Sequence, residues 1–335
     1  MMSQVFEAMS SYLRELYREF RGRAVPVIAA KPEYFGETKT SIGTAFPVAN
    51  VGNGTLFATA SHVVKGFPEV YLLIQNERET ALVPAETVVA VWQMANNIFD
   101  FALLYADKVQ LQPLNLGNSL AVVPGDMVFT LGYPLGIVRE PTIVYGNISA
   151  SDLDIRTELG IMHGIMQTTL PLNPGFSGSP ILDVNKNVIG ISRAIVVGAQ
   201  LMSYATPINF VKPFIKSMVT SGKIAYPSLS IIMFQYNPLL RRLYEYEMPQ
   251  VAQCINALKP RTIVSIITIS ENPSIPPCSA VLNVSVGYIT INNPTPAQVL
   301  QALYEAYWQG VPLTMTLQTP AGVVTVQPQY TLKTL

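Results

Sequence analysis

The stretch LNPGFSGSPIL, residues 172–182, places Ser177 between Gly175 and Gly178, with a proline just outside each glycine. Glycine permits backbone angles and close approaches that a side chain forbids, and proline stiffens the chain on either side. Such a cluster commonly marks a tight turn between two strands, and this is the structural alternative here. The second interpretation is a serine nucleophile whose neighbouring N–H groups point at a reacting carbonyl.

The composition predicts a folded protein with more than one domain. The chain has 335 residues, of which 49% are hydrophobic and 13% charged. It has 21 acidic and 21 basic residues and no basic run, so we expect no nucleic-acid partner. No apolar run approaches the ~20 residues of a membrane helix, and the N-terminus lacks the apolar core of a signal peptide. We therefore expect a cytoplasmic protein without a membrane span, or an extracytoplasmic one if the sequence is truncated.

The cysteines and histidines are too few and too widely spaced for a metal site. Cys254 and Cys278 either form one bridge or remain unpaired thiols, and a cytosolic location favours the second alternative. His62 and His163 show no zinc spacing relative to them. The chain also lacks a phosphate-binding loop pattern, so we expect neither a metal nor another cofactor.

Hydrophobic periodicity divides the chain into three parts. Residues 1–22 have apolar positions at helical spacing and predict an amphipathic helix. Residues 23–222 consist mainly of short β-rich runs separated by Gly, Asn, Pro and Asp, which predicts a barrel or a sandwich, and end in a helix. Residues 223–335 mix strand and helix patterns and predict a smaller α+β module, joined through a linker at residues 223–227.

A serine needs an adjacent base to act as a nucleophile near neutral pH. His62 and His163 are the candidates, and each is also compatible with a structural or surface role. Asp100 leads directly into an apolar run, where a carboxylate needs a partner such as an imidazole N–H. No histidine follows Ser177, which excludes the chain order of an α/β-hydrolase, and no aspartate precedes His62, which the subtilisin order requires. The order that remains is His62, Asp100, Ser177, with His163 as a weaker alternative base.

Three segments in this order resemble the active-site segments of trypsin-like serine proteases of the HtrA (Deg) family. They are TASHVV (59–64), DFALL (100–104) and NPGFSGSP (173–180). The flanking segments GTAFPV, LGYPLGI and YGNISA also resemble that family, and the similarity extends over about residues 38–216. Residues 224–335 resemble the PDZ domain that follows the protease in the family, with SVGYITINNPTPAQVLQAL as the best stretch.

The resemblance implies a mostly β fold, with a chymotrypsin-like double β-barrel, a PDZ-like α+β domain and an N-terminal helix. It implies Ser177 as the nucleophile, His62 as general base and then acid, and Asp100 as the residue that orients His62. The N–H groups of Gly175 and Ser177 would form the oxyanion hole. Two residues depart from the pattern, namely Phe176 just before the serine and Ser179 in place of a common glycine.

The resemblance also indicates a preference for an apolar residue at P1, the substrate position just before the cleaved bond. Pro171 stands where trypsin carries the acid that binds Lys or Arg, and Arg193 is expected to point outward. The residues predicted to line this S1 pocket are Pro171, Ile191, Ala194 and Ile195.

In the PDZ-like module, the family captures peptides by strand addition, with a loop that holds a C-terminal carboxylate. The corresponding residues are Ser228, Leu229, Ser230 and Ile231, with Ser230 at the place of a glycine. A PDZ fold that only packs or regulates is the alternative.

The implied function is an ATP-independent serine endopeptidase that cleaves unfolded or damaged proteins in protein quality control. The alternatives are a non-catalytic chaperone or adaptor that retains both folds, and a narrow processing enzyme with one substrate. Expected partners are unfolded polypeptides, peptides at the PDZ-like domain and further copies of the chain, with trimers assembled through the N-terminal helix.

Overall fold

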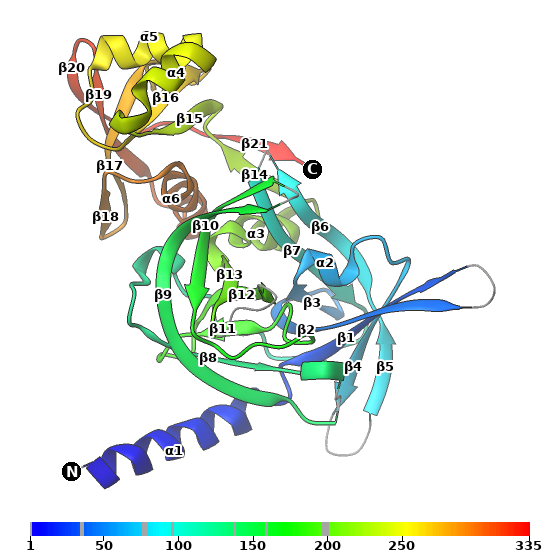
Figure 1. Ribbon diagram of the computed structural model, residues 1–335. Helices are drawn as coiled ribbons and strands as arrows, with labels where there is room; N and C mark the ends of the chain where they lie inside the picture. The colour runs from blue at the N-terminus through cyan, green and yellow to red at the C-terminus, as the bar shows by residue number, and fades with distance from the viewer. Residues whose placement is uncertain are drawn as a thin grey trace. The chain divides into compact units, whose positions relative to one another are not determined.

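The computed structural model describes residues 2–33, 37–75, 80–94, 97–136, 139–157, 160–195 and 201–335. The chain forms two compact units, residues 1–211 and 212–335 (Figure 1). The first unit is built almost entirely from strands, and the second mixes strands and helices. The predicted fold class is confirmed, because the strands of the first unit form two barrel-like halves.

The first half is an antiparallel sheet in the order β5-β4-β1-β2-β3-β7, with β6 paired to β7. Its apolar side chains, among them Val27, Phe57, Leu72 and Leu104, pack into one core cluster with the short helix α2 (Ser61–Val64). The strands are β1 (Val25–Pro32), β2 (Thr38–Val51), β3 (Gly54–Thr59), β4 (Glu69–Gln75), β5 (Thr80–Pro84), β6 (Glu86–Met94) and β7 (Asn97–Ala106).

The second half closes on itself, because β13 pairs with both β12 and β10 in the order β13-β12-β11-β8-β9-β10. Closure removes free strand edges and encloses a core of buried side chains such as Val128, Met166 and Ile181. The strands are β8 (Met127–Gly132), β9 (Thr142–Thr157), β10 (Gly160–Thr168), β11 (Pro180–Leu182), β12 (Val188–Ile195) and β13 (Ser203–Pro207); the short helices are η2 (Ser119–Ala121), η3 (Pro134–Gly136) and η4 (Ile208–Phe210).

The N-terminal helix α1 (Met2–Phe20) packs on its own unit through its C-terminal half. Leu16 and Phe20 are buried, and the ring of Tyr12 lies 5.4 Å from that of Phe129. In its N-terminal half, Phe6 is exposed.

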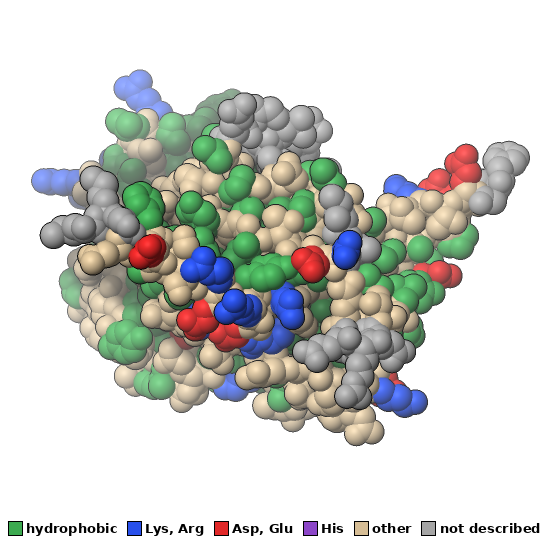
Figure 2. Space-filling model, turned by 90° about the horizontal axis from the view of Figure 1, so that it is seen from below, with side chains coloured by type: hydrophobic (Ala, Val, Ile, Leu, Met, Phe, Trp, Pro, Cys, Tyr) green, Lys and Arg blue, Asp and Glu red, His purple; other side chains and the backbone are tan. Residues whose placement is uncertain are grey.

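Lys, Arg, Asp and Glu side chains intermingle on the face of the molecule in Figure 2.

The second unit contains a six-stranded sheet with β15 at one edge, in the order β15-β16-β17-β19-β20, and β18 pairs with β17. A separate pair joins β14 to β21, and the helix that the sequence places at the end of residues 23–222 is α3, which contacts α6 and β14. The elements are α3 (Lys212–Ser221), β14 (Ala225–Ser228), β15 (Ile231–Tyr236), η5 (Pro238–Leu240), α4 (Arg241–Glu247), α5 (Pro249–Leu258), β16 (Val264–Ser270), β17 (Ser279–Val286), β18 (Ile289–Asn292), α6 (Pro296–Gln309), β19 (Leu313–Thr319), β20 (Gly322–Val326) and β21 (Thr331–Thr334).

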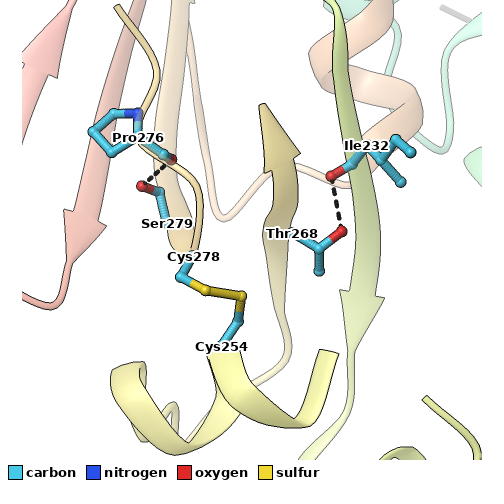
Figure 3. Close-up of a disulfide and its surroundings, with 6 residues drawn as sticks. All are labelled: Ile232, Cys254, Thr268, Pro276, Cys278 and Ser279. Carbon is cyan, nitrogen blue, oxygen red and sulfur yellow. Dashed lines mark hydrogen bonds between the residues drawn. A yellow bond between two sulfur atoms is a disulfide. The ribbon is translucent and has the colours of Figure 1, made fainter. Parts of the chain in front are cut away.

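The two cysteines form a disulfide within the second unit. Cys254 on α5 is bonded to Cys278, which precedes β17 (Figure 3). Of the two alternatives left by the sequence, the bridge is therefore the one found, and the expectation of unpaired thiols was wrong. In the described part of the chain, no helix is both long and apolar enough to cross a membrane.

Candidate active site

The loop that carries Ser177 requires both of its glycines. Gly175 and Gly178 have φ angles of +101° and +89°, in the region that L side chains rarely adopt. A Cβ at Gly175 would lie 2.2 Å from the Tyr133 carbonyl oxygen, and one at Gly178 would lie 2.2 Å from the Thr44 carbonyl oxygen. The two glycines therefore allow the serine loop to press against neighbouring backbone, and a turn alone would not require such close contacts.

Thr44 on β2 holds this loop to the first barrel. Its N–H donates to the Ser177 carbonyl at 2.8 Å, and its hydroxyl donates to the Gly175 carbonyl at 2.8 Å. Its own carbonyl accepts from the Thr59 hydroxyl at the end of β3, at 2.8 Å. Sequence reasoning missed this role, although Thr44 lies within the GTAFPV segment that it singled out.

The carbonyl groups that precede the Gly175 and Ser177 N–H groups are both hydrogen-bonded. The Pro174 carbonyl accepts from Leu135 N–H at 2.7 Å, and the Phe176 carbonyl accepts from Ser179 N–H at 2.9 Å. In a trans peptide the N–H points opposite to the carbonyl, so the N–H groups of Gly175 and Ser177 point away from these partners. Neither of them donates to another residue in the described ranges.

The two residues that depart from the family pattern are both buried. The Phe176 ring is 2% exposed and belongs to the core of the second barrel. Ser179 is fully buried, and its hydroxyl lies 2.9 Å from that of Thr130 and 2.8 Å from that of Ser192. Both side chains therefore anchor the serine loop to β8 and β12, and neither obstructs Ser177.

His62 and Asp100 form a close pair in the first barrel. The Asp100 Oδ2 atom lies 2.8 Å from Nδ1 of His62, and Oδ1 accepts from the His62 backbone N–H at 2.9 Å. Asp100 has a φ of +51° within β7, a conformation that aspartate tolerates better than most residues. His62 lies in the first turn of α2, directly after β3, with about a third of its side chain exposed. Its Nε2 edge thus remains free of the carboxylate.

The serine loop lies against the segment that carries His62. A Cβ at Gly178 would come within 2.2 Å of Thr59 Oγ1 and 2.8 Å of the Ala60 nitrogen, two residues before the histidine. The Ser177 hydroxyl itself makes no hydrogen bond to another described residue. Catalytic hydrogen bonds are often long in the absence of substrate. The structure therefore brings the three predicted segments together, with the His62–Asp100 contact formed and Ser177 beside it.

Arg193 is the feature of this site that sequence reasoning placed wrongly. Its side chain is 6% exposed and does not point outward. Its Nε donates to Asp100 Oδ2 at 3.0 Å, the same oxygen that contacts His62. Burial favours the protonated form of Asp100, but hydrogen bonds from His62 and the charge of Arg193 outweigh it and lower the pKa of Asp100. Asp100 is therefore held ionised by two partners.

The predicted pocket residues are only partly accounted for. Ile191 is fully buried in β12, opposite Pro180 and Thr206, and Pro171 is exposed. Ala194 and Ile195 belong to the end of β12, but their side chains lie outside the described residues.

The second histidine forms a separate pair with an aspartate of β9. His163 Nδ1 on β10 lies 2.9 Å from Asp154 Oδ2 on β9, and both side chains are substantially exposed. The N–H of Gly164 also donates to Asp154 at 3.3 Å.

The predicted carboxylate loop of the second unit precedes the edge strand β15. Ser228 ends β14, Leu229 is buried and Ile231 begins β15. Ser230 has a φ of +54°, which explains why a glycine suits this place in the family pattern. Its N–H contacts the Ser228 hydroxyl at 3.2 Å.

Nothing in the described residues suggests a metal centre. Groups of three or more His, Cys, Asp or Glu side chains with suitable geometry do not occur among them. The chemistry available at the site is that of a hydroxyl, an imidazole, a carboxylate and backbone N–H groups.

Comparisons with known proteins show what this chain is similar to. The family model of the trypsin-like peptidase domain matches residues 43–191. The serine protease Do-like HtrB of Bacillus subtilis is 30% identical over 183 residues, which are 52% of this chain and 38% of that protein. A probable periplasmic serine endoprotease DegP-like of Pseudomonas fulva is 25% identical over 254 residues, 74% of this chain and 50% of that protein. The chain thus spans about half the length, or less, of these curated relatives.

Solved structures share the fold over nearly the whole chain. The structure described as HtrA-type protease AlgW with tripeptide superposes with a TM-score of 0.57 and 19% identity, and covers 97% of this chain and 98% of that one. The same protease with a decapeptide gives a TM-score of 0.57 and 18% identity, with 97% and 99% covered.

Proposed function

We propose that this chain is a trypsin-like serine protease of the HtrA type and acts as an ATP-independent serine endopeptidase. The observation that carries the proposal is the His62–Asp100 contact of 2.8 Å beside the loop of Ser177. A scaffold that merely retained the fold would not need an intact base, its orienting carboxylate and a nucleophile in one place.

In the proposed reaction, His62 Nε2 removes the proton of the Ser177 hydroxyl as its oxygen attacks the substrate carbonyl. Asp100 keeps the other ring nitrogen protonated and stabilises the imidazolium that forms. The N–H groups of Gly175 and Ser177 donate to the oxyanion, a contribution of roughly 3 kcal/mol for each donor. His62 then returns the proton to the leaving amine, and water hydrolyses the acyl-enzyme by the same steps in reverse.

The proposed substrates are unfolded or damaged polypeptides, cleaved after apolar residues. An S1 pocket lined by Pro171, Ile191, Ala194 and Ile195 would offer apolar surface and no carboxylate for a basic side chain. Selectivity among apolar residues should be loose, because one methylene is worth only about 1–3 kcal/mol in such a pocket. Exposed apolar segments distinguish misfolded chains from folded ones, and they suit a site of this kind.

Within the second unit, we assign residues 223–335 to a PDZ-like domain that takes up peptides by strand addition. β15 has a neighbour only on its β16 side within the described sheet, so its other edge is available for a peptide strand. The loop Ser228–Ile231 supplies the backbone N–H groups for a C-terminal carboxylate, and Ser230 already has the left-handed conformation that such a loop uses. The solved HtrA-type protease named above was determined with a tripeptide and with a decapeptide.

The proposal also covers the assembly of the chain into trimers and its location in an oxidising compartment. The exposed N-terminal half of α1, with Phe6 on its surface, is the segment through which copies of the chain would form trimers. The Cys254–Cys278 bridge supports an oxidising compartment rather than the cytoplasm, since cytosolic thiols are generally kept reduced. A relative in Pseudomonas fulva is named as probably periplasmic.

The decisive experiment compares the wild-type chain with Ser177→Ala. We expect a fluorophosphonate probe to label the wild type at Ser177 and unfolded casein to be cleaved, while the variant does neither. Folded proteins of similar size should resist cleavage. If casein stays intact while its aggregation is still suppressed, the chain is a non-catalytic chaperone, and if one specific protein is cut but casein is not, it is a narrow processing enzyme.

A further inference from the structure

A buried guanidinium shares a carboxylate oxygen with the proposed catalytic histidine. Arg193 and Asp100 are 6% and 2% exposed at their side chains, and Arg193 Nε lies 3.0 Å from Oδ2. His62 Nδ1 lies 2.8 Å from the same Oδ2. One carboxylate thus faces two groups that are, or become, cationic.

The charge balance of this cluster differs from that of a histidine and an aspartate alone. When His62 is in its neutral form, the charges of Arg193 and Asp100 cancel and the cluster carries no net charge. When His62 takes up a proton, the cluster gains a full positive charge instead of becoming a neutral ion pair. Charge interactions are strong where water is excluded, so Arg193 opposes this step while it holds Asp100 in place.

The other groups around Arg193 do little to offset its repulsion of a protonated His62. Asp100 is the carboxylate that contacts it among the described residues. The Trp92 ring centroid on β6 lies 6.0 Å from the guanidinium carbon and 5.6 Å from Lys65 Nζ, so the next charged group on this side is another cation. The Nη1 atom of Arg193 is buried without a hydrogen-bond partner. Its principal polar contact is therefore the Asp100 carboxylate.

We propose that Arg193 is a positioning residue of this site, which holds the Asp100 carboxylate in place and makes protonation of His62 less favourable than it would be beside Asp100 alone. This inference rests on the proposed function, and it implies a protease that stays active in more acidic solution than one without the guanidinium. Loss of activity at low pH reflects protonation of the base, so a cation beside Asp100 delays that loss.

The test uses two substitutions in the full chain. Arg193→Gln removes the charge and keeps a hydrogen-bond donor, whereas Arg193→Lys keeps the charge and loses the planar fork. The pH at which His62 takes up its proton is followed by NMR of ¹⁵N-histidine. The rate of fluorophosphonate labelling of Ser177 is measured from about pH 4 to about pH 9, which extends roughly two units on either side of an ordinary histidine pKa. His163 serves as an internal control, because it is the one other histidine in the chain.

We expect the His62 midpoint and the acidic limb of the labelling profile to move up by about one to two pH units in Arg193→Gln. Arg193→Lys should move them much less, and the His163 midpoint should stay within a few tenths of a unit. Equal midpoints in the wild type and Arg193→Gln would overturn the proposal, as would a shift of the same size in Arg193→Lys. If Arg193→Gln is too unstable to study, an unshifted profile in Arg193→Lys together with a shifted one in Arg193→Met supports the proposal, and identical profiles in both overturn it.

The two proposals can fail separately. If the probe does not label the wild type at all, the proposed hydrolase is wrong, but the NMR titration still measures the influence of Arg193 on His62. If labelling is normal and the midpoints coincide, the hydrolase stands and the role of Arg193 is rejected.

Discussion

The first unit contains two histidine–aspartate pairs with almost the same contact distance and very different surroundings. His62–Asp100 and His163–Asp154 have Nδ1–Oδ2 distances of 2.8 and 2.9 Å. The side chain of Asp100 is 2% exposed, whereas that of Asp154 is 56% exposed. Contact geometry alone therefore does not mark a catalytic base. Burial of the carboxylate, a second cation on it and a serine loop beside it distinguish the first pair.

The two pairs should also differ in energy. An exposed ion pair contributes about 0–1 kcal/mol, because water solvates both groups and salt screens their attraction. A buried carboxylate that loses its partner, or a buried cation that loses its carboxylate, costs about 3–5 kcal/mol. Any experiment in which the two pairs respond alike would contradict this distinction between them.

The largest expected difference is in activity. His62→Ala should reduce the rate of fluorophosphonate labelling at Ser177 by about 10⁴-fold or more, because the serine loses its base. His163→Ala should label at the wild-type rate, since His163 is paired with the exposed Asp154, whereas the serine loop lies against the segment of His62. Both effects are measured as labelling rates at about pH 8, where an ordinary histidine is mostly unprotonated. A comparable loss in His163→Ala would show that the wrong pair has been assigned.

The next difference is in stability and its dependence on pH. Asp100→Asn leaves Arg193 buried without a counter-charge and should lower the free energy of unfolding by about 3–5 kcal/mol near neutral pH. Asp154→Asn should cost less than about 1 kcal/mol. Urea unfolding of both variants and the wild type measures these values.

The sign of the pH dependence follows from the lowered pKa of folded Asp100. Its contribution is fully present above the unfolded pKa of about 3.9 and is lost as the pH falls from there through the lower folded pKa. The stability gap between the wild type and Asp100→Asn should therefore narrow in that acidic window. A gap that stays constant there would contradict the assignment of Asp100 as an ionised partner of Arg193.

The smallest effect concerns an exposed ion network on α1. Lys186 Nζ lies 2.8 Å from Glu15 and 2.7 Å from Glu19, and these carboxylates raise the pKa of Lys186. Lys186→Gln should weaken the docking of α1 by roughly 0.5–1 kcal/mol, with the loss largely abolished by about 1 M salt. Hydrogen exchange of the α1 amides measures this. For the raised pKa, the stabilisation is present below the unfolded value and is lost as the pH rises through the folded one.

Much of the fold and of the site was predictable because it depends on backbone requirements. The glycines around Ser177, the apolar run after Asp100 and the short segment before His62 each leave a local signature in the sequence. Their order along the chain is that of the chymotrypsin-type triad, and the resemblance to trypsin-like serine proteases implies the rest of the arrangement. The double barrel is implied by the same resemblance, and the pairing of β10 with β13 closes its second half.

The features that were missed depend on tertiary contacts. The direction of Arg193 is set by the buried carboxylate that it meets, which no local pattern reveals. α5 was not predicted; it begins at Pro249, separated by one residue from the end of α4, where a proline indicates a break rather than the start of a helix. The disulfide links positions 24 residues apart, and sequence separation alone does not show whether two thiols meet.

The Cys254–Cys278 bond closes a covalent ring of the chain that includes β16, the neighbour of the edge strand β15 in the second sheet. A single cut anywhere inside that ring would open the backbone without separating the pieces. The fragments would migrate together on a denaturing gel and would come apart only after treatment with a thiol reagent. Nicked and intact chains therefore look identical until they are reduced.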